Sequence, residues 1–178
     1  MTAPVLVGLG AAPRTPERSA VLRRRIRIIV TITIVWNVIE AIVALIAGGI
    51  ASSAALIGFG LDSIVEVLSA AAVAWQFAIP DHERREKVAL RVIAVSFFAL
   101  AAYVSVDAIL SLLGMREPEH SPVGIVIAAL SLIVMPFLSW FERRTGRELG
   151  SASAIADSKQ TLLCTYLSAA LLVVLLLN

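Results

Sequence analysis

The segment GFGLDSIVE, residues 58–66, contains two acids in apolar surroundings. It lies near the middle of an apolar run, residues 54–79, which exceeds the roughly 20 residues that a helix needs to cross a bilayer. Asp62 and Glu66 are four residues apart, so on a helix they share one face. An ionisable side chain at the centre of a membrane costs about 2.5–3.5 kcal/mol on insertion scales and is normally retained for a function. We therefore expect the rest of the chain to enclose this pair.

The composition is that of a membrane protein. The chain has 178 residues, 59% of them hydrophobic, and a mean hydropathy of +0.91. Soluble domains contain about 45–50% apolar residues, so the excess predicts membrane spans and leaves little room for a separate soluble domain. The single cysteine, Cys164, excludes an internal disulfide and a CxxC metal site. Both histidines, His82 and His120, fall in predicted loops, and no nucleophile–base pair is recognisable, so we do not expect an enzyme.

The hydrophobic pattern predicts an all-α polytopic bundle. We expect a flexible basic tail over residues 1–25 and a transmembrane domain over residues 26–178. Five spans are predicted, at residues 28–50, 54–79, 88–113, 122–140 and 153–177. Polar loops are predicted at residues 81–87 and 142–148, and Pro136 is expected to kink the fourth span.

The positive charges predict the orientation of the bundle. All of the 15 Lys and Arg residues except Arg116 and Lys159 lie in residues 14–27, 81–91 or 142–148. These three segments share one side of the membrane if every span crosses it. The positive-inside rule then places the N-terminus in the cytoplasm, and five crossings put the C-terminus outside.

Polar side chains follow one face of several predicted spans. The second span carries Asp62 and Glu66 on this face, and the fifth carries Gln160 and Cys164. The first span adds a polar face that includes Asn37 and Glu40. At about 1.5 Å of rise per residue, Glu40, Glu66 and Cys164 come to similar depths. Carboxyl groups that face one another there would share protons or hold a cation, and oxygen with sulfur suits divalent metals.

Structural roles are open for the same side chains. Asp62 and Glu66 could be buried, protonated carboxyl groups with a structural role. Glu40 could form a hydrogen bond to Asn37 or to a neighbouring helix that packs the helices together. Cys164 fits a filler of the core.

Other charged residues have simpler interpretations. Asp157 is expected in the first turn of the fifth helix, where the helix dipole favours an acid. Asp107 is expected near the outer interface, in contact with water. The arginines of residues 23–27 act first as topology signals and only second as lipid-binding groups.

Two segments carry a family resemblance. GGIASSAALIGFGLDSIVEVLSAA, residues 48–71, resembles the glycine–serine turn and Asp-x-x-x-Asp second helix of the cation diffusion facilitators, with Glu66 as the second acid. ADSKQTLLC, residues 156–164, resembles their fifth-helix motif Ala-Asp-x-x-His-x-x-x-Asp, with Gln160 and Cys164 at the ligand positions. The loop residues His82 and Glu86 resemble their His-Gly-Lys-x-Glu motif before the third helix.

The resemblance implies a function and a site. It implies a multi-pass protein of the cell (inner or plasma) membrane, usually a homodimer, that exports a divalent cation by proton antiport. Zinc is the first expectation for the cation, with manganese or iron as alternatives. The implied metal ligands are Asp62, Glu66, Gln160 and Cys164, and Glu40 with Asn37 are candidate additional residues of the transport site. The family pattern has six helices, so a sixth helix is expected to be absent, in nature or by truncation.

Two alternatives remain open. A bundle lined by carboxyl groups also fits a proton-coupled exporter of organic cations that uses Glu40 or Glu66. The replacements at Gln160 and Cys164 also fit a non-transporting membrane subunit or scaffold with a degenerate site. No nucleic-acid partner is expected.

Overall fold

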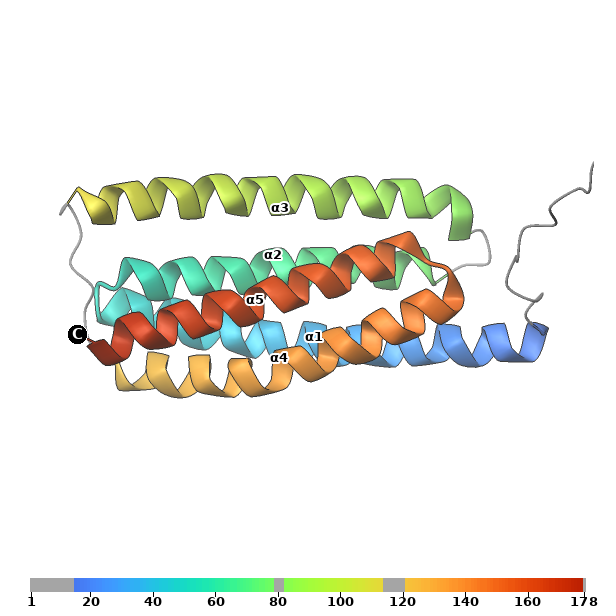
Figure 1. The fold of residues 1–178 in the computed structure, drawn as a ribbon, viewed down its shortest axis with the longest axis horizontal. Coiled ribbons are helices and arrows are strands. Elements are labelled where there is room, and N and C mark those ends of the chain that lie inside the picture. Colours follow the sequence, from blue (N-terminus) through green and yellow to red (C-terminus); the bar gives the residue numbers. More distant parts are fainter. Residues whose placement is uncertain (1–14, 79–81, 114–120, 178) are drawn as a thin grey trace, which may run out of the picture.

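The computed structural model describes residues 15–78, 82–113 and 121–177. In these ranges the chain forms five α-helices and no strand. They are α1 (Pro16–Ile50), α2 (Ala54–Gln76), α3 (His82–Leu112), α4 (Pro122–Leu149) and α5 (Ala152–Leu177). The helices run side by side along the long axis of the molecule (Figure 1), and each contains a segment long and apolar enough to cross a membrane. The predicted all-α class and the five spans are confirmed.

Helices α1, α2, α4 and α5 form the centre of the bundle. The most extensive contacts are between α1 and α2 and between α4 and α5, and α3 packs along the outside against α2 and α5 (Figure 1). Along α2 the buried residues change from Leu56 and Phe59 to polar groups and then to Ala70 and Val73. Two apolar clusters therefore lie toward the ends of the bundle, with the buried acids of α2 between them.

The first helix begins earlier than the sequence pattern predicts. Residues 16–25 of the expected flexible tail are helical, whereas residues 1–14 lie outside the described part of the chain. The backbone N–H of Arg18 donates to the side chain of Thr15 (3.3 Å), and Pro16 and Glu17 occupy the first turn. A cap, a proline at the first position and an early acid are all favourable helix starts, so the arginine-rich segment extends the span as a helix.

The predicted polar loop at residues 142–148 is wrong, because α4 continues through Pro136 to Leu149. The helix ends at Gly150, which adopts a left-handed conformation (φ 73°) that favours glycine. Polarity alone does not end a helix, since Glu and Arg are good helix formers.

The predicted loop at residues 81–87 is also helical from His82 onward. Its residue Glu86 connects α3 to the start of α5. One oxygen of Glu86 accepts hydrogen bonds from the backbone N–H groups of Ala152 (2.7 Å) and Ser153 (3.3 Å) and from the hydroxyl of Ser151 (3.1 Å). A carboxylate that accepts the free N–H groups at a helix N-terminus stabilises that terminus. Glu86 therefore has a structural role in this fold.

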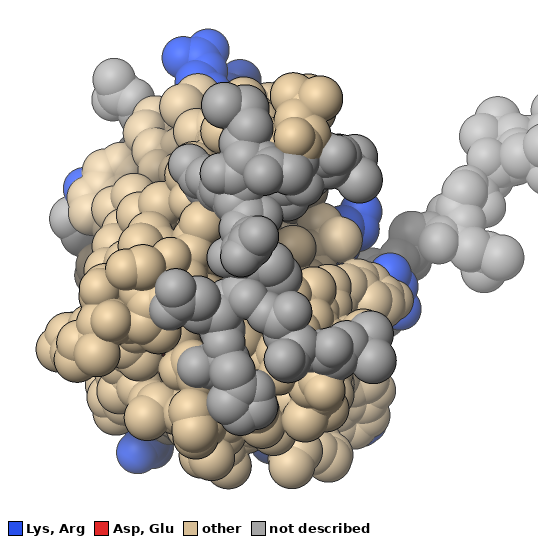
Figure 2. Space-filling view, turned by 90° about the vertical axis from the view of Figure 1, so that its left-hand side faces the viewer, with Lys and Arg blue, Asp and Glu red and all other residues tan. Residues whose placement is uncertain are grey.

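The charges are distributed unevenly along the bundle. Every Lys and Arg that the structure describes lies in the half of its helix nearest the start of α1, the start of α3 and the α4–α5 turn. Figure 2 shows the opposite end, where the described surface is almost entirely of uncharged residues and Lys and Arg atoms appear only around the rim. We call the first end the basic end. The positive-inside rule predicts that the basic end faces the cytoplasm.

Close packing of α1 on α2 depends on Gly60. A Cβ atom at this position would lie 2.8 Å from Cγ of Leu45 and 3.2 Å from its backbone nitrogen. The same addition at Gly49 would meet nothing within 4 Å. We expect Gly60→Ala to destabilise the bundle by about 1–3 kcal/mol through overpacking. Gly49→Ala should be neutral or stabilising by up to about 1 kcal/mol, because alanine favours a helix.

Denaturant unfolding of the two purified variants in detergent, followed by circular dichroism, measures the difference. Equal stability of the two variants would contradict the close approach of α1 and α2 at Gly60.

Candidate functional site

The two acids of α2 lie deep inside the bundle. Asp62 is 2% exposed and Glu66 is fully buried. One oxygen of Asp62 and both oxygens of Glu66 have no hydrogen-bond partner in the described part of the chain. Neither acid forms a salt bridge with a described Lys or Arg. The interior therefore contains carboxyl oxygens that are free to bind a proton or a cation.

Helix α5 brings Cys164 to the same place. The thiol of Cys164 is 1% exposed and interacts with the carboxyl groups of both Asp62 and Glu66. Thr161, one turn earlier on α5, also lies beside Glu66. Gln160 is 2% exposed, and neither polar atom of its amide has a hydrogen-bond partner among the described residues. The structure therefore places Cys164 beside each of the two acids and buries Gln160 one turn earlier on the same helix.

Glu40 links three helices next to this group. Its two oxygens accept hydrogen bonds from the hydroxyl groups of Ser63 on α2 (3.1 Å) and Ser131 on α4 (3.0 Å). It is fully buried and lies within electrostatic reach of Asp62. The hydrogen bonds of Glu40 to α2 and α4 therefore support the alternative that Glu40 packs neighbouring helices together. Asn37 is buried too, but its amide donates to the carbonyl oxygen of Thr33 (3.0 Å) and no hydrogen bond to Glu40 is present.

The described side chains do not form a closed metal site in this conformation. Among them, no three His, Cys, Asp or Glu groups lie close enough together to hold one ion. The arrangement is a row of acids and one thiol along the interior. The side chains of His82 and Asp107, and residue His120, lie outside what the structure describes.

A second pair of acids, Glu142 on α4 and Asp157 on α5, also lies in the interior. Both side chains are fully buried, and their carboxyl groups face each other. Ser69 of α2 donates a hydrogen bond to Asp157, and both oxygens of Glu142 lack a hydrogen-bond partner in the described chain. Glu66 lies within electrostatic reach of both acids. The pair therefore extends the row of buried acids from Glu66 toward the basic end.

Sequence reasoning missed this pair for identifiable reasons. Asp157 lies in the second turn of α5 and contacts other helices, so the interpretation as a first-turn acid favoured by the dipole is wrong. Glu142 falls in the segment 142–148, which polarity predicts to be a loop. The buried residues of α4 include Ser131, Met135, Ser139 and Glu142, at helical spacings of four, four and three. Continuing that period beyond Trp140 would have placed Glu142 in the interior.

A comparison with known protein families identifies the family of the chain. Residues 30–178 match the family described as the cation efflux transmembrane domain. The chain belongs to this family, the transmembrane domain of the cation diffusion facilitators, and the suspected resemblance is confirmed. It is therefore a multi-pass membrane protein of a cation-transporter family. No solved structure matches the chain.

Proposed function

We propose that this protein exports a divalent metal cation in exchange for protons, with Asp62, Glu66 and Cys164 as the core of the transport site. The proposal rests on two buried carboxyl groups that each lie beside the buried thiol of Cys164, and neither carboxyl group forms a salt bridge with a described Lys or Arg. Membership of the cation efflux family supports the transport of a cation. Zinc fits a mixed oxygen and sulfur ligand set best, and manganese or iron are the alternatives.

The exchange follows from the chemistry of the ligands. A metal ion binds the deprotonated carboxylates, and protonation of the same groups releases it. The cytoplasm therefore supplies the metal ion and receives protons, whereas the outside supplies protons and receives the metal ion. Glu40 and Gln160 are further buried oxygen donors that a change of side-chain conformation or helix position would add. Asn37 is a second candidate on α1. We propose that such a change accompanies alternating access.

The Glu142–Asp157 pair fits a proton route in this scheme. At about 1.5 Å of rise per residue, Asp157 lies about 10 Å along the axis of α5 from Cys164, toward the basic end. We propose that protons displaced from Asp62 and Glu66 by an incoming cation leave through Glu142 and Asp157. The Ser69 hydroxyl, which donates to Asp157, holds that carboxyl group toward α2.

We further propose a homodimer in the inner or plasma membrane with the basic end in the cytoplasm. The family resemblance supports the dimer, and the clustering of the described Lys and Arg at one end supports the orientation.

Neutralising the α2 acids tests the transport site. We expect Asp62→Asn with Glu66→Gln to lower the proton-driven flux of zinc into proteoliposomes at least about tenfold, because both ionisable carboxyl groups are lost. The matched control is Glu17→Gln, which removes an exposed acid near the basic end and outside the row of buried acids.

Flux of the double variant equal to that of the control would contradict the site assignment. Flux of an organic cation but no metal by the unaltered protein would favour the organic-cation exporter. No divalent-ion binding by calorimetry would favour the non-transporting subunit.

Neutralising Glu142 tests the proton route separately. We expect Glu142→Gln to retain zinc binding at equilibrium, since Glu142 is not a proposed ligand, and to slow proton-driven zinc flux by about tenfold. Zinc binding by calorimetry and flux in proteoliposomes measure the two effects on the same preparation. Unchanged flux would contradict the route, and lost zinc binding would instead make Glu142 part of the metal site.

A further inference from the structure

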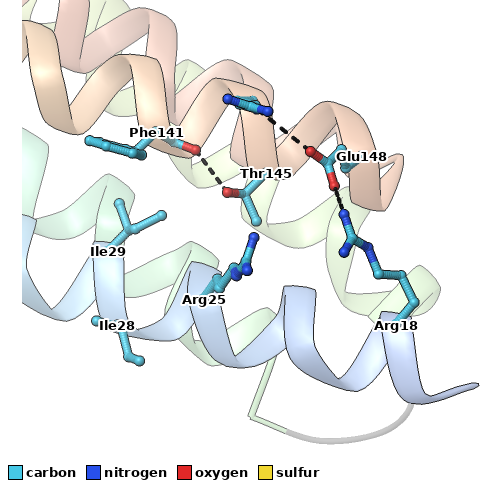
Figure 3. A pocket seen from close by; sticks show the side chains of 8 residues that line it. Arg18, Arg25, Ile28, Ile29, Phe141, Thr145 and Glu148 are labelled. Carbon is cyan, nitrogen blue, oxygen red and sulfur yellow. Dashed lines mark hydrogen bonds and ion pairs between the residues drawn. The ribbon is translucent and has the colours of Figure 1, made fainter.

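A hollow between α1 and α4 at the basic end is not used by the proposed transport mechanism. It has a volume of about 430 Å³ (Figure 3). Its lining includes Arg18, Arg25 and Ile28 of α1 and Phe141, Arg144 and Glu148 of α4. None of these residues belongs to the row of buried acids, so the hollow is a separate feature of the surface.

The polarity of the lining changes along the helix axes. Ile28 and Phe141 are each 50% exposed and form the wall nearer the middle of the bundle, together with Ile29. Figure 3 shows Arg25 about one turn further toward the basic end, extending from α1 toward Thr145. An ion pair between Arg18 and Glu148 (2.7 Å) closes the far end. The hollow is thus apolar toward the membrane interior and charged toward its surface.

The charges in the hollow do not cancel. Glu148 is the only carboxylate in the lining, and it pairs with Arg18 and more loosely with Arg144 (3.7 Å). Arg25 forms no salt bridge with any residue that the structure describes. Three guanidinium groups against one carboxylate leave an excess of positive charge beside an apolar wall.

We propose that this hollow binds one anionic phospholipid, with its phosphate on Arg25 and Arg144 and an acyl chain along Ile28 and Phe141. A guanidinium group donates paired hydrogen bonds to phosphate oxygens, and basic groups at a membrane surface attract anionic lipids. A phospholipid has the same order of charged and apolar parts as the lining. A soluble anion would leave the apolar wall uncovered, so the lipid is the better fit.

Native mass spectrometry of the purified chain in detergent, titrated with phosphatidylglycerol or phosphatidylcholine, tests the proposal. The unaltered protein should retain one phosphatidylglycerol per chain and bind it more tightly than phosphatidylcholine. Arg25→Gln with Arg144→Gln should weaken phosphatidylglycerol binding by about twenty-fivefold, because each surface arginine contributes about fivefold. Arg91→Gln with Arg147→Gln removes the same charge from exposed positions outside the hollow and should leave binding unchanged.

Several results would overturn the proposal. These are equal binding by the two double variants, equal retention of the two lipids by the unaltered protein, and displacement of the lipid by an equal concentration of inorganic phosphate. If Arg25→Gln with Arg144→Gln lowers the dimer fraction and leaves lipid binding unchanged, the hollow binds a second copy of the chain, and the lipid proposal is wrong. If the first double variant loses helix content by circular dichroism, Arg25→Gln alone replaces it, with an expected loss of about fivefold.

Discussion

The fold depends on how the interior accommodates the buried carboxyl groups of the described residues. Their residues are Glu40, Asp62, Glu66, Glu142 and Asp157. None of them forms a salt bridge within the described part of the chain. Replacing these acids with apolar residues of similar size should leave the stability of the bundle unchanged or raise it, because buried charged groups rarely stabilise a fold. What remains is a polar path that crosses from α1 and α2 to α4 and α5, with apolar clusters toward both ends of the bundle. Selection for function explains this arrangement better than selection for stability does.

The five helices could be predicted because hydrophobic length and periodicity are local signals. The boundaries that failed were those judged by polarity. Residues 16–25, 82–87 and 142–148 are charged, yet all are helical, because caps and helix-forming side chains decide where a helix ends. Gly150 with its left-handed backbone marks the true end of α4. The long helices carry the basic residues at one end of the bundle and form the hollow between α1 and α4.

The site could be predicted in part. The four-residue spacing of Asp62 and Glu66 required a shared face, and the depth argument brought Cys164 to the same level. The hydrogen bonds of Glu40 to Ser63 and Ser131 depend on how α1, α2 and α4 are rotated about their axes, which no single helix specifies. The Glu142–Asp157 contact likewise depends on the length of α4 beyond Trp140. The contacts between side chains of different helices therefore could not be predicted from the sequence alone.

The proposed mechanism requires a metal ion to bind between the α2 carboxyl groups and the α5 thiol. X-ray absorption at the zinc edge on the zinc-loaded protein measures the ligands of that ion. We expect a mixed shell of oxygen ligands and one sulfur at about 2.3 Å, and the loss of that sulfur in Cys164→Ser. An oxygen-only shell in the unaltered protein, or no bound zinc after removal of excess metal, would contradict this mechanism.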